Sequence, residues 1–358
     1  MTRKQTLILA GVAIVLGVLV YFQFRTWRQF DWRAFAAATR GLSHRSSVLR
    51  LLIAVALVQV ICWLRAVRWK LFLQPVRKTR VRDLLPAQYI GFTGLALLGR
   101  PGELIRPYLI AKQEGLTLSS QLAVWTVERI FDIGAFAVLL CIDVFAFSDG
   151  LPHSGALRRI SLALLALLFI LVLGAWLVQR LGSAASDWIE KHFARVSFGV
   201  SKAVGNNLRA FGEGLHTIAG VASFFQLAGV SLVIWYGIAL VYLLVLQAYP
   251  QPALHNMHLP QAVLLVASSM VGSLIQLPAV GGGTQLAVIS MLSSVEWFAV
   301  PNELGVSAGI LLWLVTIMGV VPAGLALARG ARLSFHQLSR EIQEAAPKHA
   351  VNQTGRGV

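Results

Sequence analysis

Six ionisable side chains lie in two otherwise apolar stretches, where a membrane segment would not be expected to carry charge. The first stretch, LALLGRPGELIRPYLI, holds two arginines and a glutamate, and the second, AVWTVERIFDIGAF, holds two acids and an arginine. An ionised side chain near the centre of a bilayer costs about 2.5–3.5 kcal/mol even on lenient insertion scales. We therefore expect these charges to pair with one another or to line a polar cavity. The six residues are Arg100, Glu103, Arg106, Glu128, Arg129 and Asp132.

The spacing of these charges allows two interpretations. On a helix, Arg100, Glu103 and Arg106 would share one face because they lie three residues apart. Arg129 and Asp132 have the same spacing and could pair, while the acid before Arg129 would face elsewhere and meet an arginine of the first stretch. One interpretation is a structural ion-pair network that holds the segments together. The other is a cavity in which arginines bind a phosphate group through bidentate hydrogen bonds.

Glycine and proline interrupt two apolar regions, Leu84–Arg106 and Leu259–Leu292. Such interruption is typical of discontinuous or re-entrant helices, whose unwound backbone needs protein or water partners inside a membrane. The interruptions are either tight breakers between half-helices or the walls of a backbone-lined ligand site. Residues at these interruptions that would line such a site are Gly102, Pro278, Gly281, Gly282, Gly283 and Gln285.

The sequence shows no HExxH, P-loop, GxGxxG or GxSxG motif, and its eight histidines are scattered. We therefore expect no metal, no cofactor and no ATP-driven step. An intramembrane enzyme that uses Glu103 or Glu128 as a base is a further hypothesis, but no nucleophile stands beside either acid in the sequence.

The composition places the chain in a membrane. Of its 358 residues, 57% are hydrophobic and 13% are charged, whereas a soluble protein has about 45–50% apolar and roughly 25% charged residues. The net charge of +16 falls mostly between the apolar segments, where lysine and arginine orient a membrane protein. No separate basic domain is available for nucleic-acid binding, which we do not expect.

The apolar segments predict an all-α helical bundle in one domain, residues 1–330, with two interrupted hairpins. Residues 181–218 form a polar connector that lies on the membrane surface or packs on the bundle, and residues 331–358 form a polar tail. Six full spans are expected at Thr6–Phe24, Val48–Leu64, Ser119–Phe147, Ile160–Val178, Val221–Tyr249 and Leu304–Leu327.

Loop charge predicts the orientation. The basic segment 65–82, the connector and the tail would be cytoplasmic, as would both termini, and the uncharged loop 250–258 would be external. Segment 25–50 does not fit, since it is basic yet would be external. With this topology the two interrupted regions enter from opposite sides, like an inverted pair around a central site.

Four motifs occur in order: LRAVRW (Leu64–Trp69), GRPGELIRPYLI (Gly99–Ile110), VERIFD (Val127–Asp132) and LPAVGGG (Leu277–Gly283). Together they resemble the flippase-like transmembrane region of lysylphosphatidylglycerol synthases and related stand-alone bacterial membrane proteins. The resemblance implies a helical, polytopic inner-membrane domain with a lipid cavity. It also implies that five charged residues stand at the family's polar positions: Glu103, Arg106, Glu128, Arg129 and Asp132. The late motif differs from the family pattern, because Val280 replaces a proline and Thr284 stands at a glycine position.

We therefore expect a bacterial inner-membrane transporter that binds an anionic lipid in an intramembrane polar cavity. Hopanoid, isoprenoid-linked and glycerophospholipid cargoes all fit this expectation. The alternative is a non-catalytic membrane subunit that presents lipid to a partner glycosyltransferase or lipid-modifying enzyme. The chain ends in a short polar tail, where the synthases have a soluble aminoacyl-transferring domain, so we expect no aminoacylation of lipid.

Overall fold

The computed structural model describes residues 32–146, 155–170, 172–173, 221–274 and 282–330. Every regular element in these residues is a helix, which confirms the predicted all-α fold. Three segments that the sequence singles out lie outside the described residues: the first predicted span, the connector 181–218 and the tail 331–358.

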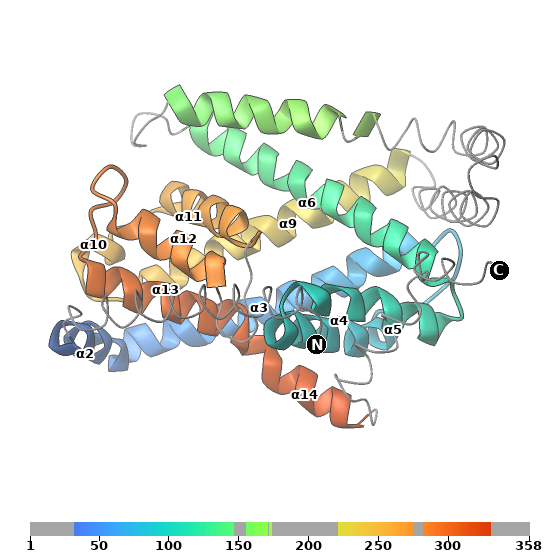
Figure 1. The fold of residues 1–358 in the computed structure, drawn as a ribbon, viewed down its shortest axis with the longest axis horizontal. Coiled ribbons are helices and arrows are strands. Elements are labelled where there is room, and N and C mark those ends of the chain that lie inside the picture. The colour runs from blue at the N-terminus through green and yellow to red at the C-terminus, as the bar shows by residue number, and fades with distance from the viewer. Residues whose placement is uncertain (1–31, 147–154, 171, 174–220, 275–281, 331–358) are drawn as a thin grey trace, which may run out of the picture.

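The helices lie along the molecule with the two interrupted regions at opposite ends (Figure 1). A helical segment over 155–170 follows α6. The named elements are α2 (Trp32–Arg40), η1 (Gly41–Ser43), α3 (Arg45–Leu73), α4 (Val81–Leu98), η2 (Arg100–Leu104), α5 (Ile105–Glu114), α6 (Leu118–Ala146), α9 (Val221–Leu246), α10 (Pro252–His255), α11 (Leu259–Gly272), α12 (Gly282–Ser293), α13 (Asn302–Thr316), η4 (Met318–Val320) and α14 (Val321–Gly330).

Three helical stretches of the described chain are long and apolar enough to cross a membrane: α3, α9 and the run from α13 to α14. The last of these was expected to be one continuous span, but the turn η4 interrupts it. Helix α6 is as long as α3, at 29 residues, and carries buried charges among its apolar residues. The predicted spans at Ser119–Phe147 and Val221–Tyr249 are therefore helices with nearly the predicted bounds.

Helix α3 extends further than the sequence predicts. The expected span ends at Leu64 because a basic run follows, yet the helix continues to Leu73. Arginine is a good helix former, and the first breaker is Pro75, which cannot continue the hydrogen-bond ladder. Arg65 and Arg68 therefore belong to the helix rather than to a cytoplasmic loop, which corrects the predicted boundary.

The first interrupted region is a helical hairpin, as predicted. Helix α4 ends at Gly99, whose φ of 70° turns the chain into η2, and α5 returns against α4. Gly102 lies against the backbone of Gly94, where any Cβ atom would collide with the carbonyl group. The hairpin continues to Glu114, beyond its predicted end at Arg106.

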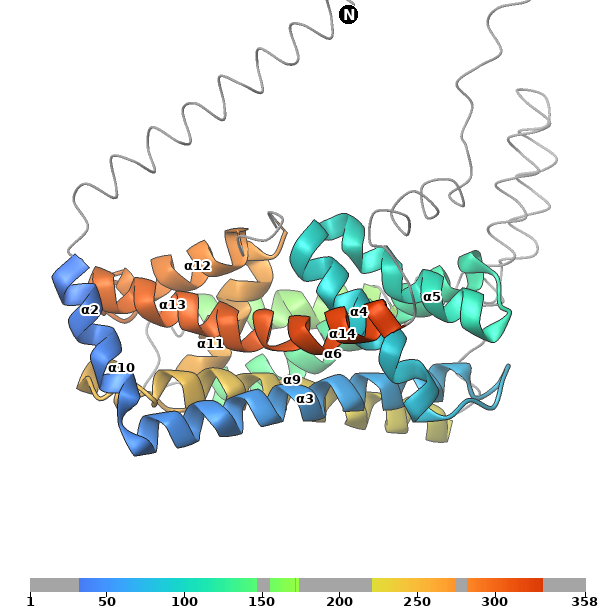
Figure 2. The same ribbon diagram turned by 90° about the horizontal axis from the view of Figure 1, so that it is seen from below.

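The second interrupted region is also a hairpin, formed by α11 and α12. A Cβ atom on Gly272 would collide with the carbonyl of Gly283, so these two helices approach closely where glycine allows it. Figure 2 shows the two hairpins toward opposite ends of α3 and α9, and Arg100 of η2 contacts Ser273 at the end of α11. The structure thus contains both predicted hairpins, and their inverted orientation in the membrane stays a prediction. The membrane side from which each hairpin enters remains a prediction.

The core has two parts along the bundle. The larger one packs α3, α6, α9, α11 and α13, with Tyr249 and Leu265 fully buried in it. The smaller one packs the C-terminal half of α3 against the first hairpin and α6, around Trp69 and Phe72. The buried charges lie where the first hairpin meets α3, α6 and α9.

Candidate functional site

Arg68 is the centre of a buried ion-pair network. Its side chain is fully buried, and it donates to Glu128 Oε1 at 2.6 Å and to Asp132 Oδ1 at 2.7 Å. It also donates to the Ser231 hydroxyl at 2.9 Å. One guanidinium from α3 therefore joins α6 and α9, through hydrogen bonds that are each charge-assisted or buried.

Arg106 brings the first hairpin into the same network. It donates to both carboxylate oxygens of Glu128, at 3.2 Å in the longer contact, and to Gln88 Oε1 at 3.4 Å. Its guanidinium lies 4.4 Å from the centroid of the Trp69 ring, a distance at which cation–π attraction is effective. The sequence interpretation that an acid of the second stretch meets an arginine of the first is confirmed by this geometry.

Arg129 completes the network from its edge. It lies 3.2 Å from Asp132, the predicted pair three residues apart, and 3.5 Å from Glu128. Unlike Arg68, it keeps 41% of its side chain exposed. We use "ion-pair network" for Arg68, Arg106, Glu128, Arg129 and Asp132. Its three arginines face two carboxylates, so the network holds one excess positive charge in an apolar surrounding.

Arg100 and Glu103 lie apart from this network. They pair with each other at 3.2 Å at the tip of the first hairpin, where Arg100 is exposed. Arg100 also donates to the carbonyl of Ser273, at the tip of the second hairpin, at 2.7 Å. The prediction that Arg100, Glu103 and Arg106 share one helical face is wrong. The chain forms the 3-10 turn η2 before α5 begins, which sends Arg106 inward and Arg100 toward the other hairpin.

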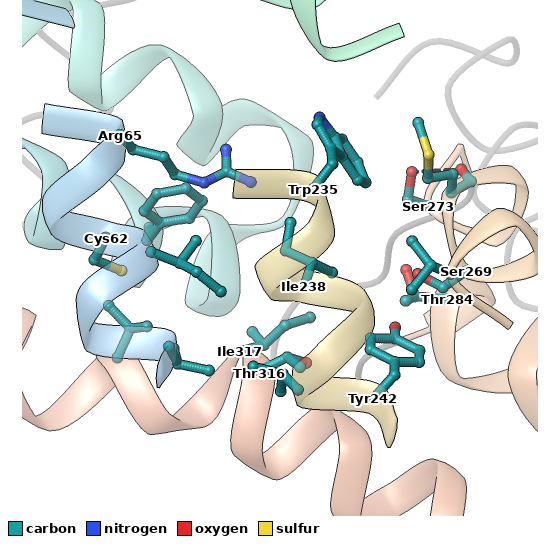
Figure 3. Close-up of a pocket in the computed structure, with 17 residues that line it drawn as sticks. Cys62, Arg65, Trp235, Ile238, Tyr242, Ser269, Ser273, Thr284, Thr316 and Ile317 are labelled. Atoms are coloured by element: carbon teal, nitrogen blue, oxygen red, sulfur yellow. Dashed lines mark hydrogen bonds between the residues drawn. The ribbon is translucent and has the colours of Figure 1, made fainter. Parts of the chain in front are cut away.

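A cavity of about 240 Å³ lies beside the network, between α3, α9, the C-terminal end of α13 and the second hairpin. Its walls are mostly aliphatic, and Arg65 is the one charged residue among the described residues that line it. Trp235 connects cavity and network, because it lines the cavity and donates to Asp132 Oδ1 at 3.0 Å. Figure 3 shows Arg65 on one side of this cavity, with Ser269 and Thr284 on the other.

Arg65 differs from the network arginines in its partners. Its guanidinium lies 5.1 Å from the centroid of the Phe92 ring. Within the described part of the chain it forms no ion pair with a carboxylate. Arg65 is thus a half-buried cation that faces a cavity and packs near an aromatic ring, with Asp132 and Glu128 close enough to attract it without a direct ion pair.

Arg65 and Arg68 are the site residues that sequence reasoning missed. Both were assigned to a loop because they open a basic run, which ordinarily marks the end of a span. A usable signal was present in the sequence. The two arginines lie three residues apart among apolar neighbours, with no helix breaker before Pro75.

The structure describes four of the six residues predicted to line a backbone site at the interruptions. Gly102 is buried in the turn of the first hairpin and serves close packing rather than lining the cavity. Gly282 and Gly283 begin α12, and Gly283 contacts Gly272. Thr284 lines the cavity, whereas its neighbour Gln285 is not among the lining residues. Pro278 and Gly281 lie outside the described residues.

The family model described as the lysylphosphatidylglycerol synthase TM region matches residues 8–324. The chain belongs to this family. The match spans the network, the cavity and both hairpins, and it confirms the resemblance carried by the four motifs. Membership in this family indicates a membrane protein of lipid metabolism or transport. No curated protein and no solved structure matched the chain.

Histidine, cysteine and acidic side chains form no group that could hold a metal ion in the portion of the chain that the structure describes. The described side chains at this site are guanidinium groups, the carboxylates that they bind, hydroxyl groups and apolar walls. Such a site can bind a polar, negatively charged group inside an apolar bundle, next to surfaces that would accept hydrocarbon.

Proposed function

We propose that this protein moves an anionic lipid across the membrane, with the lipid headgroup passing through the cavity beside the ion-pair network. The observation that carries the proposal is the excess of arginines over carboxylates around the cavity. The network holds three arginines against two carboxylates, and Arg65 adds a further cation at the cavity wall.

An unneutralised charge inside an apolar bundle is costly and persists where a function requires it. The carboxylates Glu128 and Asp132 already bind two or more arginines each, so with Arg65 nearby the two acids are outnumbered by arginines. A phosphate group in the cavity would supply the missing negative charge. Arginine suits this task because its planar fork matches the oxygens of a phosphate.

The arrangement of the hairpins supports passage between the two sides. They lie toward opposite ends of the bundle, and η2 meets the end of α11 near the cavity through the hydrogen bond from Arg100 to the Ser273 carbonyl. Ser273 itself lines the cavity. In membrane transporters, discontinuous helices of opposite entry surround a substrate site near the bilayer centre. We infer that the headgroup passes between these tips.

Transport can be tested with full-length protein in liposomes that contain acyl-labelled fluorescent phosphatidylglycerol. Dithionite, which does not cross the bilayer, bleaches only the outer leaflet unless the lipid moves. We expect bleaching beyond the outer-leaflet fraction with the wild type and slowed bleaching with Arg65→Gln. Arg82→Gln is the matched control, because its side chain is 72% exposed outside the cavity.

Bleaching equal to that of protein-free liposomes would contradict transport. If the same protein nevertheless retained bound lipid, the result would favour the alternative function, in which a membrane subunit presents lipid to a separate lipid-modifying enzyme.

A further inference from the structure

Helix α6 carries one more buried acid, Asp143, which lies outside the ion-pair network. The residue is 4% exposed, and its Oδ2 atom is buried without a hydrogen-bond partner. Within the described part of the chain Asp143 forms no ion pair either. An ionised carboxylate in such a place is costly, because nothing offsets the hydration that it loses. The buried side chain is therefore stable only in its neutral form, with a proton bound.

The helices packed against α6 bring no opposite charge to Asp143. Helix α11 has no titratable side chain, and α9 has only Tyr236 and Tyr242. The helical segment over 155–170, which also contacts α6, carries Arg158 and Arg159.

Arg158 approaches α6 on a different side from Asp143. Its guanidinium lies 5.8 Å from the centroid of the Phe145 ring, and residues two apart on a helix do not share a face. Helix α5 meets α6 through Arg106 and Glu128, roughly 22 Å along the helix from Asp143. The described surroundings of Asp143 thus contain no charged group that would hold its ionised form.

Asp143 lies on the same face of α6 as Asp132 of the network. The two acids are eleven residues apart, which is three helical turns plus about 20°, or roughly 16 Å along the axis. Asp132 is held in its ionised form by Arg68 and Arg129. One face of α6 therefore carries an acid that arginines keep charged and an acid that can gain and lose a proton.

We propose that Asp143 is a proton-binding site whose protonation is linked to movement of the lipid, so that a proton gradient drives that movement. The link rests on the proposed function, whereas the proton site does not. In the conformation described, the carboxyl group is neutral and closed to solvent. When the site opens, the carboxyl O–H bond breaks, its proton passes to a water molecule as hydronium, and the carboxylate that remains is hydrated. The reverse step, from water on the other side, restores the acid.

Helix α6 provides the physical connection between that proton and the cavity. Because ionised Asp143 needs water, α6 must shift against α9 and α11 to hydrate it. The same helix binds Arg68 and Arg106 through its other acids, and Asp132 accepts a hydrogen bond at 3.0 Å from Trp235, which lines the cavity. A shift of α6 therefore also moves the cavity wall. Intramembrane acids carry protons in this way in pumps and transporters.

Infrared difference spectroscopy of the full-length protein in lipid bilayers detects the proton directly. Spectra at mildly acidic and mildly alkaline pH would be compared for the wild type, Asp143→Asn and Asp83→Asn. Asp83 is the matched control, because its side chain is 47% exposed on α4. We expect a protonated-carboxyl band that shifts in heavy water and disappears at alkaline pH in the wild type and the control, and that is absent from Asp143→Asn. Identical spectra for all three proteins would overturn the proton site.

The link to transport is tested in the liposome assay with a pH difference across the bilayer. The lumen is made acidic, so that the dithionite outside stays near neutral pH. We expect the gradient to change the rate of lipid movement for the wild type and Asp83→Asn. Asp143→Asn should move lipid at one rate with or without the gradient, because asparagine cannot release a proton. A gradient response that persists in Asp143→Asn would overturn the link.

Thermal unfolding in detergent distinguishes loss of the proton from loss of the fold. Asparagine has nearly the shape of aspartic acid and no charge to bury, so Asp143→Asn should unfold at the same temperature as the wild type or higher. A lower midpoint would show that the ionised acid has a partner and would overturn the proposal. A pH-dependent Asp143 band without lipid movement would refute transport and leave the proton site. Lipid movement without a gradient response would leave transport and refute the link.

Discussion

Arg65 and Arg68 lie one helical turn apart on α3, yet only Arg68 is in direct contact with carboxylates. Arg68 is fully buried and held by two carboxylates at 2.6 and 2.7 Å. Arg65 faces a cavity and has no carboxylate partner in the described chain. We therefore propose that α3 supplies one arginine that holds the bundle together and one that meets a ligand. This division between structure and binding leads to distinct predictions for each charged residue.

Replacing Arg68 should destabilise the protein. Arg68→Gln would leave Glu128 and Asp132 without their central partner, and breaking a buried ion pair from one side costs about 3–5 kcal/mol. We expect a corresponding fall in the free energy of unfolding, measured by thermal or denaturant unfolding in detergent. Arg82→Gln, on the exposed end of α4, is the control. Equal stability of the two variants would show that the network does not hold the bundle.

Replacing Arg129 should affect binding more than stability. Its side chain is 41% exposed, so screening by solvent limits its ion pairs to about 1 kcal/mol. Arg129→Gln also removes the excess positive charge of the network. We therefore expect nearly normal unfolding together with weaker retention of anionic lipid and slower transport. A loss of stability as large as that of Arg68→Gln, with unchanged lipid retention, would assign Arg129 a structural role.

The hydrogen bond between the hairpin tips should matter for movement of the headgroup. Arg100→Gln removes the exposed pair with Glu103 and the 2.7 Å bond to the Ser273 carbonyl. Because the side chain of Arg100 is 44% exposed, we expect a change in unfolding free energy of about 1 kcal/mol or less. The rate of lipid movement in liposomes should change while lipid binding stays the same. An unaltered rate would exclude this contact from the path.

Close packing at the first hairpin predicts intolerance of even one methyl group. Gly102→Ala would drive its Cβ atom into the Gly94 backbone, which cannot move aside as a side chain could. Overpacking of this kind costs about 1–3 kcal/mol. The matched control is Gly229→Ala on α9, where a Cβ atom would meet nothing within 4 Å. We expect the unfolding midpoint of Gly102→Ala to fall and that of Gly229→Ala to stay unchanged. Equal midpoints would contradict the packing.

The sequence predicted those parts of the site in which a charge interrupts an apolar run. Glu128, Arg129 and Asp132 stand out in this way, and burial and pairing follow from the cost of an isolated charge in a membrane. Arg65 and Arg68 do not stand out, because they begin a basic run, and such runs usually lie in loops at the ends of membrane spans. Only the packing of α3 against α6 and α9 separates the two arginines that face inward from the basic residues that follow.

The two hairpins were predictable from their glycines and prolines, but their contact was not. A sequence shows that the helix breaks near Gly99, and it does not show that the turn is a 3-10 helix that separates Arg100 from Arg106. That separation depends on the approach of Gly102 to Gly94. The bond from Arg100 to Ser273 joins residues 173 positions apart, so no local pattern indicates it.

The most direct test of an interior site for an anionic headgroup is native mass spectrometry of the protein with the lipid that it retains from its own membrane. Wild type and Arg65→Gln would be purified in the same mild detergent, with Arg82→Gln as control. An anionic lipid that the wild type and Arg82→Gln retain and Arg65→Gln loses is the predicted result. The same lipid retained in equal amount by all three proteins would contradict a headgroup site at Arg65.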